Sequence, residues 1–217
     1  MLESSLIIAI DGPAASGKST VARRVAKELQ IVFVSSGGMY RAFTWLVLEQ
    51  GVDPKRTSEV LALLGETDFE GGEEEGLGTF AVNGRFLTRE ELSAPEVNAH
   101  VSVIAAIPEV RTRLVAEQRA YASVNGVVME GRDIGSVVFP DTSHKFYIDA
   151  SQKVREERRR AEGITDSIAD RDRTDSSREA SPLMIPQDAI VIDSSEMSVE
   201  EVVSAVVAEV RSRDSGE

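Results

Sequence analysis

The stretch that decides the fold is Gly12-Pro13-Ala14-Ala15-Ser16-Gly17-Lys18-Ser19, which matches the G-x-x-x-x-G-K-S pattern of a phosphate-binding loop. It follows the apolar run Leu6–Ile10 directly, and a helical pattern begins just after it. This order of strand, loop and helix is the context that the motif requires. The glycines let the backbone curl so that several N–H groups point at a phosphate, and the helix adds its positive N-terminal end. Lys18 would reach the β- and γ-phosphates of a nucleotide, and the Ser19 hydroxyl would hold Mg²⁺.

Short apolar segments alternate with helical patterns along the rest of the chain. The predicted strands are 6–11, 31–34, 127–129, 146–148 and 189–192, and the predicted helices are 20–29, 39–50, 57–66, 94–106, 109–123 and 199–210. Valines at helical spacing give the last helix an apolar face that suits packing against a core. This alternation predicts an α/β fold, in which a five-stranded parallel sheet is flanked by helices on both faces.

Residues 65–78 depart from this pattern, because glycines and acidic side chains are crowded together there. Such a composition favours a solvated loop. Just after it, residues 79–82 and 85–87 flank Asn83-Gly84, a dipeptide typical of a two-residue hairpin turn. We therefore expect 66–90 to form part of a small inserted lobe.

Composition excludes several classes of protein. A chain of 217 residues with 41% hydrophobic and 28% charged residues suits one well-buried globular core. The absence of cysteine excludes disulfides and thiolate metal sites, and it suits a reducing compartment. Residues 1–5 lack the basic start of a signal peptide, and the run Leu6–Ile10 is far too short to span a membrane. We expect a cytoplasmic, monomeric protein with no membrane partner.

The net charge of −13 argues against a general nucleic-acid binder, because phosphate backbones attract basic surfaces. It leaves a nucleotide enzyme open, since such an enzyme needs positive charge only in its cleft. Arginine is concentrated at 155–160 and at 171–178. A solvated helical face would explain the first cluster equally well, whereas the second lies in a polar stretch that could close over a bound nucleotide.

Two classes of P-loop protein have to be distinguished, the nucleotide switch and the phosphotransferase. A GTPase switch reads guanine with N-K-x-D, which this sequence lacks, and the D-x-x-G match at Asp68–Gly71 lies within the acidic stretch. A kinase needs a second anion pocket for the acceptor, and arginines that balance charge as the phosphoryl group moves. The candidate arginines are Arg41, Arg132, Arg155, Arg158, Arg159, Arg171 and Arg178.

Four segments together make the chain resemble the bacterial cytidylate kinases, a family of P-loop nucleoside monophosphate kinases. They are Asp11–Ser19, Ser36–Arg41, Gly131–Asp141 and Arg171–Leu183. The resemblance runs from about residue 6 to residue 211. Its most discriminating part is G-R-D-I-G-S-V-V-F-P-D at 131–141, because a phosphate loop alone would fit many unrelated enzymes.

The resemblance implies a single kinase domain over 1–217, with a monophosphate-binding lobe inserted at about 36–105 and a short lid at about 152–178. It implies that the γ-phosphoryl group of ATP is transferred to CMP or dCMP with the help of Mg²⁺, and that small-molecule substrates rather than nucleic acids are the partners. Two alternatives stay open: a kinase for another monophosphate such as UMP, and a non-catalytic nucleotide-binding switch.

The resemblance also assigns residues to the site. ATP would be bound by Gly12, Pro13, Ala14, Ala15, Ser16, Gly17, Lys18, Ser19, Thr20 and Arg158. CMP would be bound by Ser36, Tyr40, Arg41, Ser102, Arg111, Arg132, Asp133, Arg171, Asp175 and Arg178. Catalytic roles would belong to Lys18, Arg132, Arg158, Arg171 and Arg178, and the metal would be held by the Ser19 hydroxyl.

The assigned residue types suit cytosine. A carboxylate such as Asp133 accepts from the exocyclic amino group, and an arginine such as Arg111 donates to N3 and O2. Uracil carries a carbonyl in place of the amino group, and a mismatch of this kind can cost on the order of 10⁴-fold in favourable cases. No general base is expected, because phosphoryl transfer depends on positioning and charge neutralisation. Asp11, at the end of the first strand, would either orient the loop or a magnesium-bound water, or be purely structural.

The sequence departs from the usual family pattern in two places. Ser35 stands where the family usually has an acidic residue, which affects an acceptor-site or metal contact. The segment between Gln152 and Arg171 is shorter than the usual lid, which affects the arginine roles assigned there.

Overall fold

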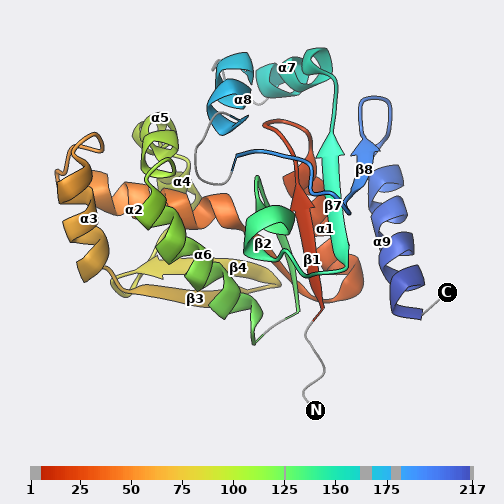
Figure 1. Cartoon of the computed structure of the whole chain (residues 1–217), viewed down its shortest axis with the longest axis horizontal. Coiled ribbons are helices and arrows are strands. Elements are labelled where there is room, and N and C mark those ends of the chain that lie inside the picture. The colour runs from red at the N-terminus through yellow and green to blue at the C-terminus, as the bar shows by residue number, and fades with distance from the viewer. Residues whose placement is uncertain (1–5, 125, 162–167, 177–181, 216–217) are drawn as a thin grey trace.

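A central β-sheet with helices on both faces organises the protein, as a computed structural model shows for residues 6–124, 126–161, 168–176 and 182–215 (Figure 1). Its strands are β1 (Ile7–Asp11), β2 (Val32–Ser35), β3 (Phe69–Glu74), β4 (Leu77–Val82), β5 (Arg85–Phe86), β6 (Val127–Gly131), β7 (His144–Asp149) and β8 (Ile190–Asp193). They lie in the order β3-β4-β2-β6-β1-β7-β8, with β5 beside β4. The phosphate-loop strand β1 is therefore an interior strand, between β6 and β7.

The five predicted strands correspond to β1, β2, β6, β7 and β8, and their parallel arrangement is confirmed. Because the strands are parallel, their carboxyl ends lie along one edge of the sheet, which is the edge where open α/β sheets bind ligands. The registers of two strand pairs determine which residues lie next to each other at this edge. Asp11 lies opposite Gly131, and Ser35 lies opposite Glu130.

Helices fill the connections between the strands. They are α1 (Lys18–Leu29), α2 (Ser36–Glu49), α3 (Thr57–Glu66), α4 (Arg89–Leu92), α5 (Pro95–Ile104), α6 (Pro108–Ala122), the π-helical turn η1 (Ile134–Val138), α7 (Gln152–Ala161), α8 (Ile168–Ser176) and α9 (Val199–Ser215). Helices α7 and α8 lie beyond the carboxyl edge of the sheet (Figure 1). Within the described ranges, no helix has the length and apolar character needed to cross a membrane.

Alternation along the buried strands divides the core into two layers. Ile8 and Ile10 of β1 pack with α1 and α9, whose valines form the opposite wall. Ala9, between them, faces the other side of the sheet and packs with Met129 of β6 and with residues of α6 and η1. A period of two along a strand sends neighbouring side chains to opposite faces, so both faces must be covered by helices.

A third apolar cluster lies outside these layers and holds α2, α3, α5 and α6 together. Phe43 of α2, Ile104 of α5 and Leu114 of α6 are fully buried at its centre. Helix α2 also carries Ser36 and Arg41, and α5 carries Ser102. The cluster thus fixes the helices from which several of the assigned acceptor residues project.

The loop predicted over 65–78 is wrong, because Phe69–Glu74 forms strand β3 and strand β4 begins at Leu77. The predicted exposure of the acidic side chains is confirmed. Strands β3 and β4 pair antiparallel from Phe69 opposite Val82 to Glu74 opposite Leu77. Strand β4 then joins β2, so this hairpin extends the central sheet. The predicted hairpin at Asn83-Gly84 is confirmed, since β4 pairs with β5 across that turn. Composition predicted solvation from charge, but it could not show that β4 supplies a pairing partner.

Tyr121 of α6 explains why glycines occur in this acidic strand. Its hydroxyl donates to the Gly72 carbonyl over 2.8 Å. A Cβ atom placed on Gly71 would lie 2.5 Å from the Tyr121 ring, well inside van der Waals contact. The glycines therefore let β3 lie against an aromatic side chain.

Replacing Gly71 with alanine tests whether this segment is packed. We expect Gly71→Ala to lower the free energy of unfolding by about 1–3 kcal/mol, because the new methyl group overpacks the contact with Tyr121. Gly65→Ala is the matched control, since a Cβ at Gly65 meets nothing within 4 Å and the residue lies in α3. The control should be neutral or slightly stabilising. Urea unfolding measures both, and equal behaviour of the two variants would contradict the packed strand.

Candidate active site

The phosphate loop lies between β1 and α1 at the carboxyl edge of the sheet. Its first glycine, Gly12, approaches the neighbouring strand so closely that a Cβ atom there would be 2.1 Å from the Ile148 carbonyl oxygen. Its φ of +154° is also one that side chains rarely adopt. Ala15 has a φ of +58°, an uncommon value for a residue with a side chain. The loop is thus curled in the manner that directs backbone N–H groups toward an anion.

Lys18 lies at the start of α1 and is buried. Its Nζ donates to the Pro13 carbonyl over 3.1 Å and lies 3.8 Å from Oε2 of Glu130. The other carboxylate oxygen of Glu130 accepts from the Ser35 hydroxyl over 2.6 Å. Ser35, which departs from the usual acidic residue of the family, is therefore a donor to the carboxylate that balances Lys18.

A cavity of about 320 Å³ opens beside the loop. Many residues assigned from the sequence line it: Ala14, Ala15, Gly17, Lys18, Ser19, Thr20, Ser36, Tyr40, Arg41, Ser102, Arg111, Arg132, Asp133 and Asp175. Its wall also includes Ser35, Glu130 and Arg159, which were not assigned. Gly12, Pro13, Ser16 and Arg158 are not among the lining residues. The structure thus brings the assigned donor and acceptor residues to a single cavity.

The acceptor side of the cavity holds a buried ion pair. Nη2 of Arg111 donates to Oδ2 of Asp133 over 2.5 Å, and both side chains are more than nine-tenths buried. Nη1 of Arg111 donates to the Ala105 carbonyl, while Nε has no hydrogen-bond partner among the described residues. Charges are buried in pairs because an isolated one costs several kcal/mol. The Arg111–Asp133 pair therefore exists without a ligand, and it leaves the buried Nε of Arg111 without an acceptor in the described part of the chain.

A second ion pair joins the acceptor wall to α8. Nε of Arg132 donates to Oδ2 of Asp175 over 2.7 Å, and Asp175 is almost fully buried. Arg132 follows β6, whereas Asp175 lies far along the chain in α8. The ion pair thus brings Asp175 to the wall of the cavity, although it is far from Arg132 in the sequence.

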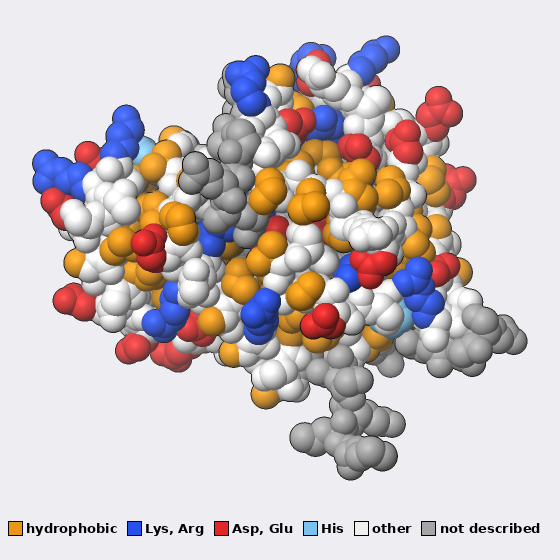
Figure 2. Space-filling model, in the orientation of Figure 1, with side chains coloured by type: hydrophobic (Ala, Val, Ile, Leu, Met, Phe, Trp, Pro, Cys, Tyr) orange, Lys and Arg blue, Asp and Glu red, His pale blue; other side chains and the backbone are white. Residues whose placement is uncertain are grey.

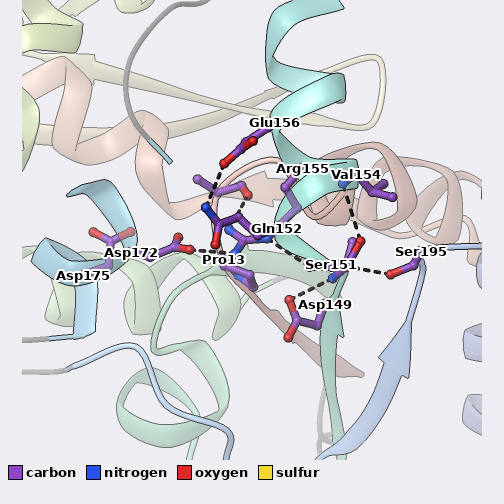
Figure 3. Close-up of polar contacts among 12 residues, drawn as sticks. Pro13, Asp149, Ser151, Gln152, Val154, Arg155, Glu156, Asp172, Asp175 and Ser195 are labelled. Carbon is purple, nitrogen blue, oxygen red and sulfur yellow. Dashed lines mark hydrogen bonds and ion pairs between the residues drawn. The ribbon is translucent and has the colours of Figure 1, made fainter. Parts of the chain in front are cut away.

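Arg155 ties α7 to both α8 and the phosphate loop (Figure 3). Its side chain points toward Asp172, and the two form an ion pair of 2.7 Å. Nη1 donates to the Ala14 carbonyl over 3.3 Å, and Nε donates to the Ala150 carbonyl over 3.0 Å. Arg155 thus holds the outer side of the loop from a helix beyond the sheet edge.

Arg158 lies behind the phosphate loop in this structure. Nη1 donates to the Ser16 carbonyl over 3.0 Å, and Nη2 donates to the Ser194 carbonyl over 2.9 Å. Its neighbour Arg159 lines the cavity instead. Arg178 lies outside the described residues, and the side chain of Arg171, whose backbone belongs to α8, is also outside them.

Asp11 is buried at the end of β1 and accepts two short hydrogen bonds. Its Oδ1 accepts from the Ile134 N–H and its Oδ2 from the Gly135 N–H, both over 2.7 Å. Burial raises the pKa of Asp11 from 3.8 to about 7; the two N–H donors and Lys18 act in the opposite direction, and the nearby Asp133 adds to the rise. This carboxyl group therefore titrates close to neutral pH.

Two residues that contact the phosphate loop or its lysine received no role from the sequence. Glu130 was not singled out, although a charged residue directly after the predicted strand 127–129 and next to Gly131-Arg132-Asp133 is a usable signal. Arg155 was named among the candidate arginines, with a solvated helical face as an equally good explanation, and was not assigned to the site. Nothing in its local sequence distinguishes it from the other arginines of α7, because its burial comes from contacts with distant elements.

The overall charge is acidic, whereas the cavity gathers Lys18, Arg41, Arg111, Arg132 and Arg159. Figure 2 shows acidic and basic side chains interspersed over one face, with Lys and Arg side chains prominent at the top, where α7 and α8 lie. Local cation clusters attract anionic ligands even when the whole molecule is negative. A strand–loop–helix phosphate site and a second cationic wall in the same cavity define the class of P-loop phosphotransferases.

Comparison with known proteins identifies the family within the class of P-loop phosphotransferases. Residues 8–212 match the profile of the family described as cytidylate kinase. The chain is 39% identical over 220 residues to the cytidylate kinase of Oceanobacillus iheyensis, which covers 96% of this chain and 95% of that protein. It is 44% identical over 220 residues to the cytidylate kinase of Pelotomaculum thermopropionicum, covering 94% and 95% respectively. The chain belongs to the cytidylate kinase family.

The raised pKa of Asp11 predicts a sign for the pH dependence of stability. Between pH 3.8 and about pH 7 the folded protein holds more protons at Asp11 than the unfolded chain does, so this group lowers stability as pH rises through that window. Asp11→Asn removes the titration. The quantity to compare is the melting temperature of Asp11→Asn minus that of the wild type. We expect this difference to increase between about pH 5 and about pH 8.

Thermal unfolding followed by circular dichroism measures this difference. Gly65→Ala, which changes no titratable group, should give a difference that does not vary with pH. A difference for Asp11→Asn that stays constant or decreases with pH would contradict the raised pKa.

Proposed function

We propose that this protein transfers the γ-phosphoryl group of ATP to CMP or dCMP, giving ADP and CDP or dCDP. One observation carries the proposal: the phosphate loop and the buried Arg111–Asp133 pair line the same cavity. The loop suits a polyphosphate, and the pair suits a base that offers both a donor and acceptors. A transferase has to hold two substrates in line, and a single cavity with two such ends does this.

At the donor end, the phosphate loop would surround the β-phosphate while Lys18 reaches the transferred group. In this structure the charge of Lys18 is balanced by Glu130. A nucleotide phosphate would exchange with that carboxylate as the partner of the lysine. Lys18 then places positive charge where negative charge shifts during transfer, which is the principal means of catalysis in this reaction.

Mg²⁺ is proposed to be held by the Ser19 hydroxyl together with phosphate oxygens. Ser19 is exposed, lines the cavity and follows Lys18 at the start of α1, so its position fits that role. Among the described residues, no three His, Cys, Asp or Glu side chains cluster as ligands for a metal. Mg²⁺ commonly binds through few protein groups and several substrate or water oxygens. When bound, the ion neutralises charge on the β- and γ-phosphates.

At the acceptor end, the Arg111–Asp133 pair would read the base. Cytosine donates from its amino group, which suits Asp133, and accepts at N3 and O2, which suits the unsatisfied Nε of Arg111. Ser102, from α5, lines the same part of the cavity. Ser36, Arg41 and Arg132 would hold the acceptor phosphate.

The family assignment of Asp175 to the acceptor ribose fits its place beside Arg132. Because the two side chains form an ion pair, one contact would hold a phosphate-binding and a ribose-binding residue side by side. We keep the proposed roles of Arg158, Arg171 and Arg178 near the phosphates, with Arg158 requiring release from the Ser16 and Ser194 carbonyls.

We also propose a three-part organisation of the single domain. Residues of about 36–105 form the monophosphate-binding lobe, and about 152–178 form the lid. The apolar cluster around Phe43 supports the lobe, because it packs α2, α3 and α5 against one another. The Arg155–Asp172 contact supports a lid whose two helices are joined. We place the protein in the cytoplasm, which a cysteine-free sequence suits; the monomeric state remains a prediction.

Acceptor selectivity separates the alternatives. Coupled ADP release with CMP, dCMP, UMP and AMP should show turnover with the two cytidine nucleotides and much less with UMP and AMP. A preference for UMP would reject cytosine reading, and turnover with none of the four would favour the non-catalytic switch.

Removing the phosphate-loop lysine should reduce turnover strongly. We expect Lys18→Ala to lower kcat by about 100-fold or more, because a preorganised charge at a reacting phosphate contributes several kcal/mol. The variant leaves Glu130 buried without its cation, so unfolding must be followed in parallel. Lys27→Ala, on an exposed part of the same helix, is the control and should keep wild-type turnover. Unchanged turnover in Lys18→Ala would reject its role.

Asp133→Asn tests base reading with less damage than truncation to alanine. Alanine would leave Arg111 buried without a counter-charge, so loss of folding and loss of binding would be confounded. Asparagine keeps the shape and one acceptor oxygen, and its amide can donate to the O4 carbonyl of uracil. We expect the ratio of kcat/KM for CMP to that for UMP to fall by about tenfold or more. An unchanged ratio in a folded variant would contradict the assignment.

A further inference from the structure

Asp11 belongs to the strand that leads into the phosphate loop, yet its carboxylate binds the other side of the site. Its backbone is followed directly by Gly12, the first residue of the loop. Its side chain accepts from the N–H groups of Ile134 and Gly135 at the start of η1. One buried residue therefore connects the donor loop by covalent bonds to the acceptor segment by hydrogen bonds.

The turn between β6 and η1 is held at both ends by this residue. In the sheet, Asp11 lies opposite Gly131, where the turn begins. Its carboxylate then fixes the N–H groups of Ile134 and Gly135, where the turn ends. Only Arg132 and Asp133 lie between these two points. Their backbone has little freedom to move relative to the phosphate loop.

The contact is tight as well as buried. Asp11 has a relative exposure of 1%, and both hydrogen bonds measure 2.7 Å. A Cβ atom on Gly135 would lie 3.3 Å from Oδ2 of Asp11 and 3.2 Å from the side chain of Lys145, so a larger residue would crowd the contact. Hydrogen bonds from N–H groups to an ionised acceptor are stronger than those between neutral groups.

We propose that Asp11 is a positioning residue for the reaction, and that its ionised carboxylate fixes Arg132 and Asp133 at the distance from the phosphate loop that phosphoryl transfer requires. The inference rests on the proposed function, because it assumes that these two residues bind the acceptor. Asp11 itself does not line the cavity, so it would act through Arg132 and Asp133. Its effect should therefore appear in acceptor binding and in kcat, with little effect on ATP binding.

Burial of this carboxyl group costs free energy, which is the reason that the pKa of Asp11 is raised to about 7. An asparagine would avoid the penalty for burying charge but could accept only one of the two N–H groups, and an apolar side chain could accept neither. The charged groups nearest to it are Lys18, which favours the ionised form, and Asp133, which opposes it. The charge of Asp11 also contributes to the raised pKa of Tyr147 in β7. An ionised carboxylate can accept both N–H groups, whereas a protonated one carries a hydrogen on one of its oxygens.

Asp11→Asn tests the proposal most directly. Its amide oxygen can accept one of the two N–H groups, but its NH₂ group faces the other donor. We expect KM for CMP to rise about tenfold and kcat to fall by up to about 100-fold, as a small misplacement of reacting groups can cause. KM for ATP should change less than about threefold. Asp149→Asn is the matched control, because Asp149 ends the neighbouring strand β7 and its Oδ1 accepts only from the adjacent Ala150 N–H among the contacts described.

Three further measurements keep the test independent of the stability of one variant. Gly135→Ala crowds the same contact from the receiving side and leaves the carboxyl group in place, so it should also raise KM for CMP selectively. Calorimetric binding of CMP and of ATP, without turnover, should show the same split in affinity. In the wild type, the advantage over Asp11→Asn in CMP affinity should shrink as pH falls from about 8 to about 6, since protonated Asp11 loses one acceptor. Titration of the CMP phosphate is common to both proteins and cancels in the ratio.

The outcomes separate this inference from the proposed function. If the wild type phosphorylates CMP while Asp11→Asn and Gly135→Ala weaken CMP and ATP binding equally, Asp11 is structural and the inference is overturned. A ratio of CMP affinities that does not vary with pH would also overturn it. If the wild type does not phosphorylate CMP at all, it is the proposed function that fails.

Discussion

Buried charged side chains are concentrated at the carboxyl edge of the sheet. Desolvation makes an isolated buried charge cost several kcal/mol, so these groups persist only as pairs with good geometry. The described pairs are Lys18–Glu130, Arg111–Asp133, Arg132–Asp175 and Arg155–Asp172. Each pair joins segments that are distant in the sequence. Three of these pairs also line the cavity, whereas Arg155 and Asp172 do not. Many of the side chains that hold this edge together therefore face the cavity as well.

This pairing constrains which ligands can bind. An anion that takes an arginine or lysine from one of these pairs leaves the partner carboxylate uncompensated. A ligand that satisfies both members of a pair avoids this penalty. In the proposed complex, cytosine would do so for Arg111 and Asp133, because it would donate to Asp133 and accept from Arg111. The structure thus suits a nucleotide with complementary donors and acceptors better than a simple phosphate ion.

Ser35 shows how one substitution changes the balance of charge at this edge. An acidic residue at this position, as the family resemblance implies, would place a second carboxyl group beside Glu130. Two carboxylates in contact disfavour joint ionisation, and the pKa of one of them rises. Here the Ser35 hydroxyl donates to Glu130 instead, so Lys18 faces a carboxylate stabilised by a hydrogen bond. The neutral residue keeps the hydrogen bond and removes the repulsion.

The sequence by itself determined the parallel sheet, the phosphate loop and the family, because strand periodicity and the spacing of loop residues are local properties of the chain. It also named most of the residues that line the cavity. Only the tertiary structure decided that the acidic segment Phe69–Glu74 is a strand and that Glu130 faces Lys18. It also decided that Arg155 contacts the phosphate loop and that Asp11 binds the turn between β6 and η1. Strand pairing and the burial of charge depend on partners far along the chain, and no local pattern of residues specifies those partners.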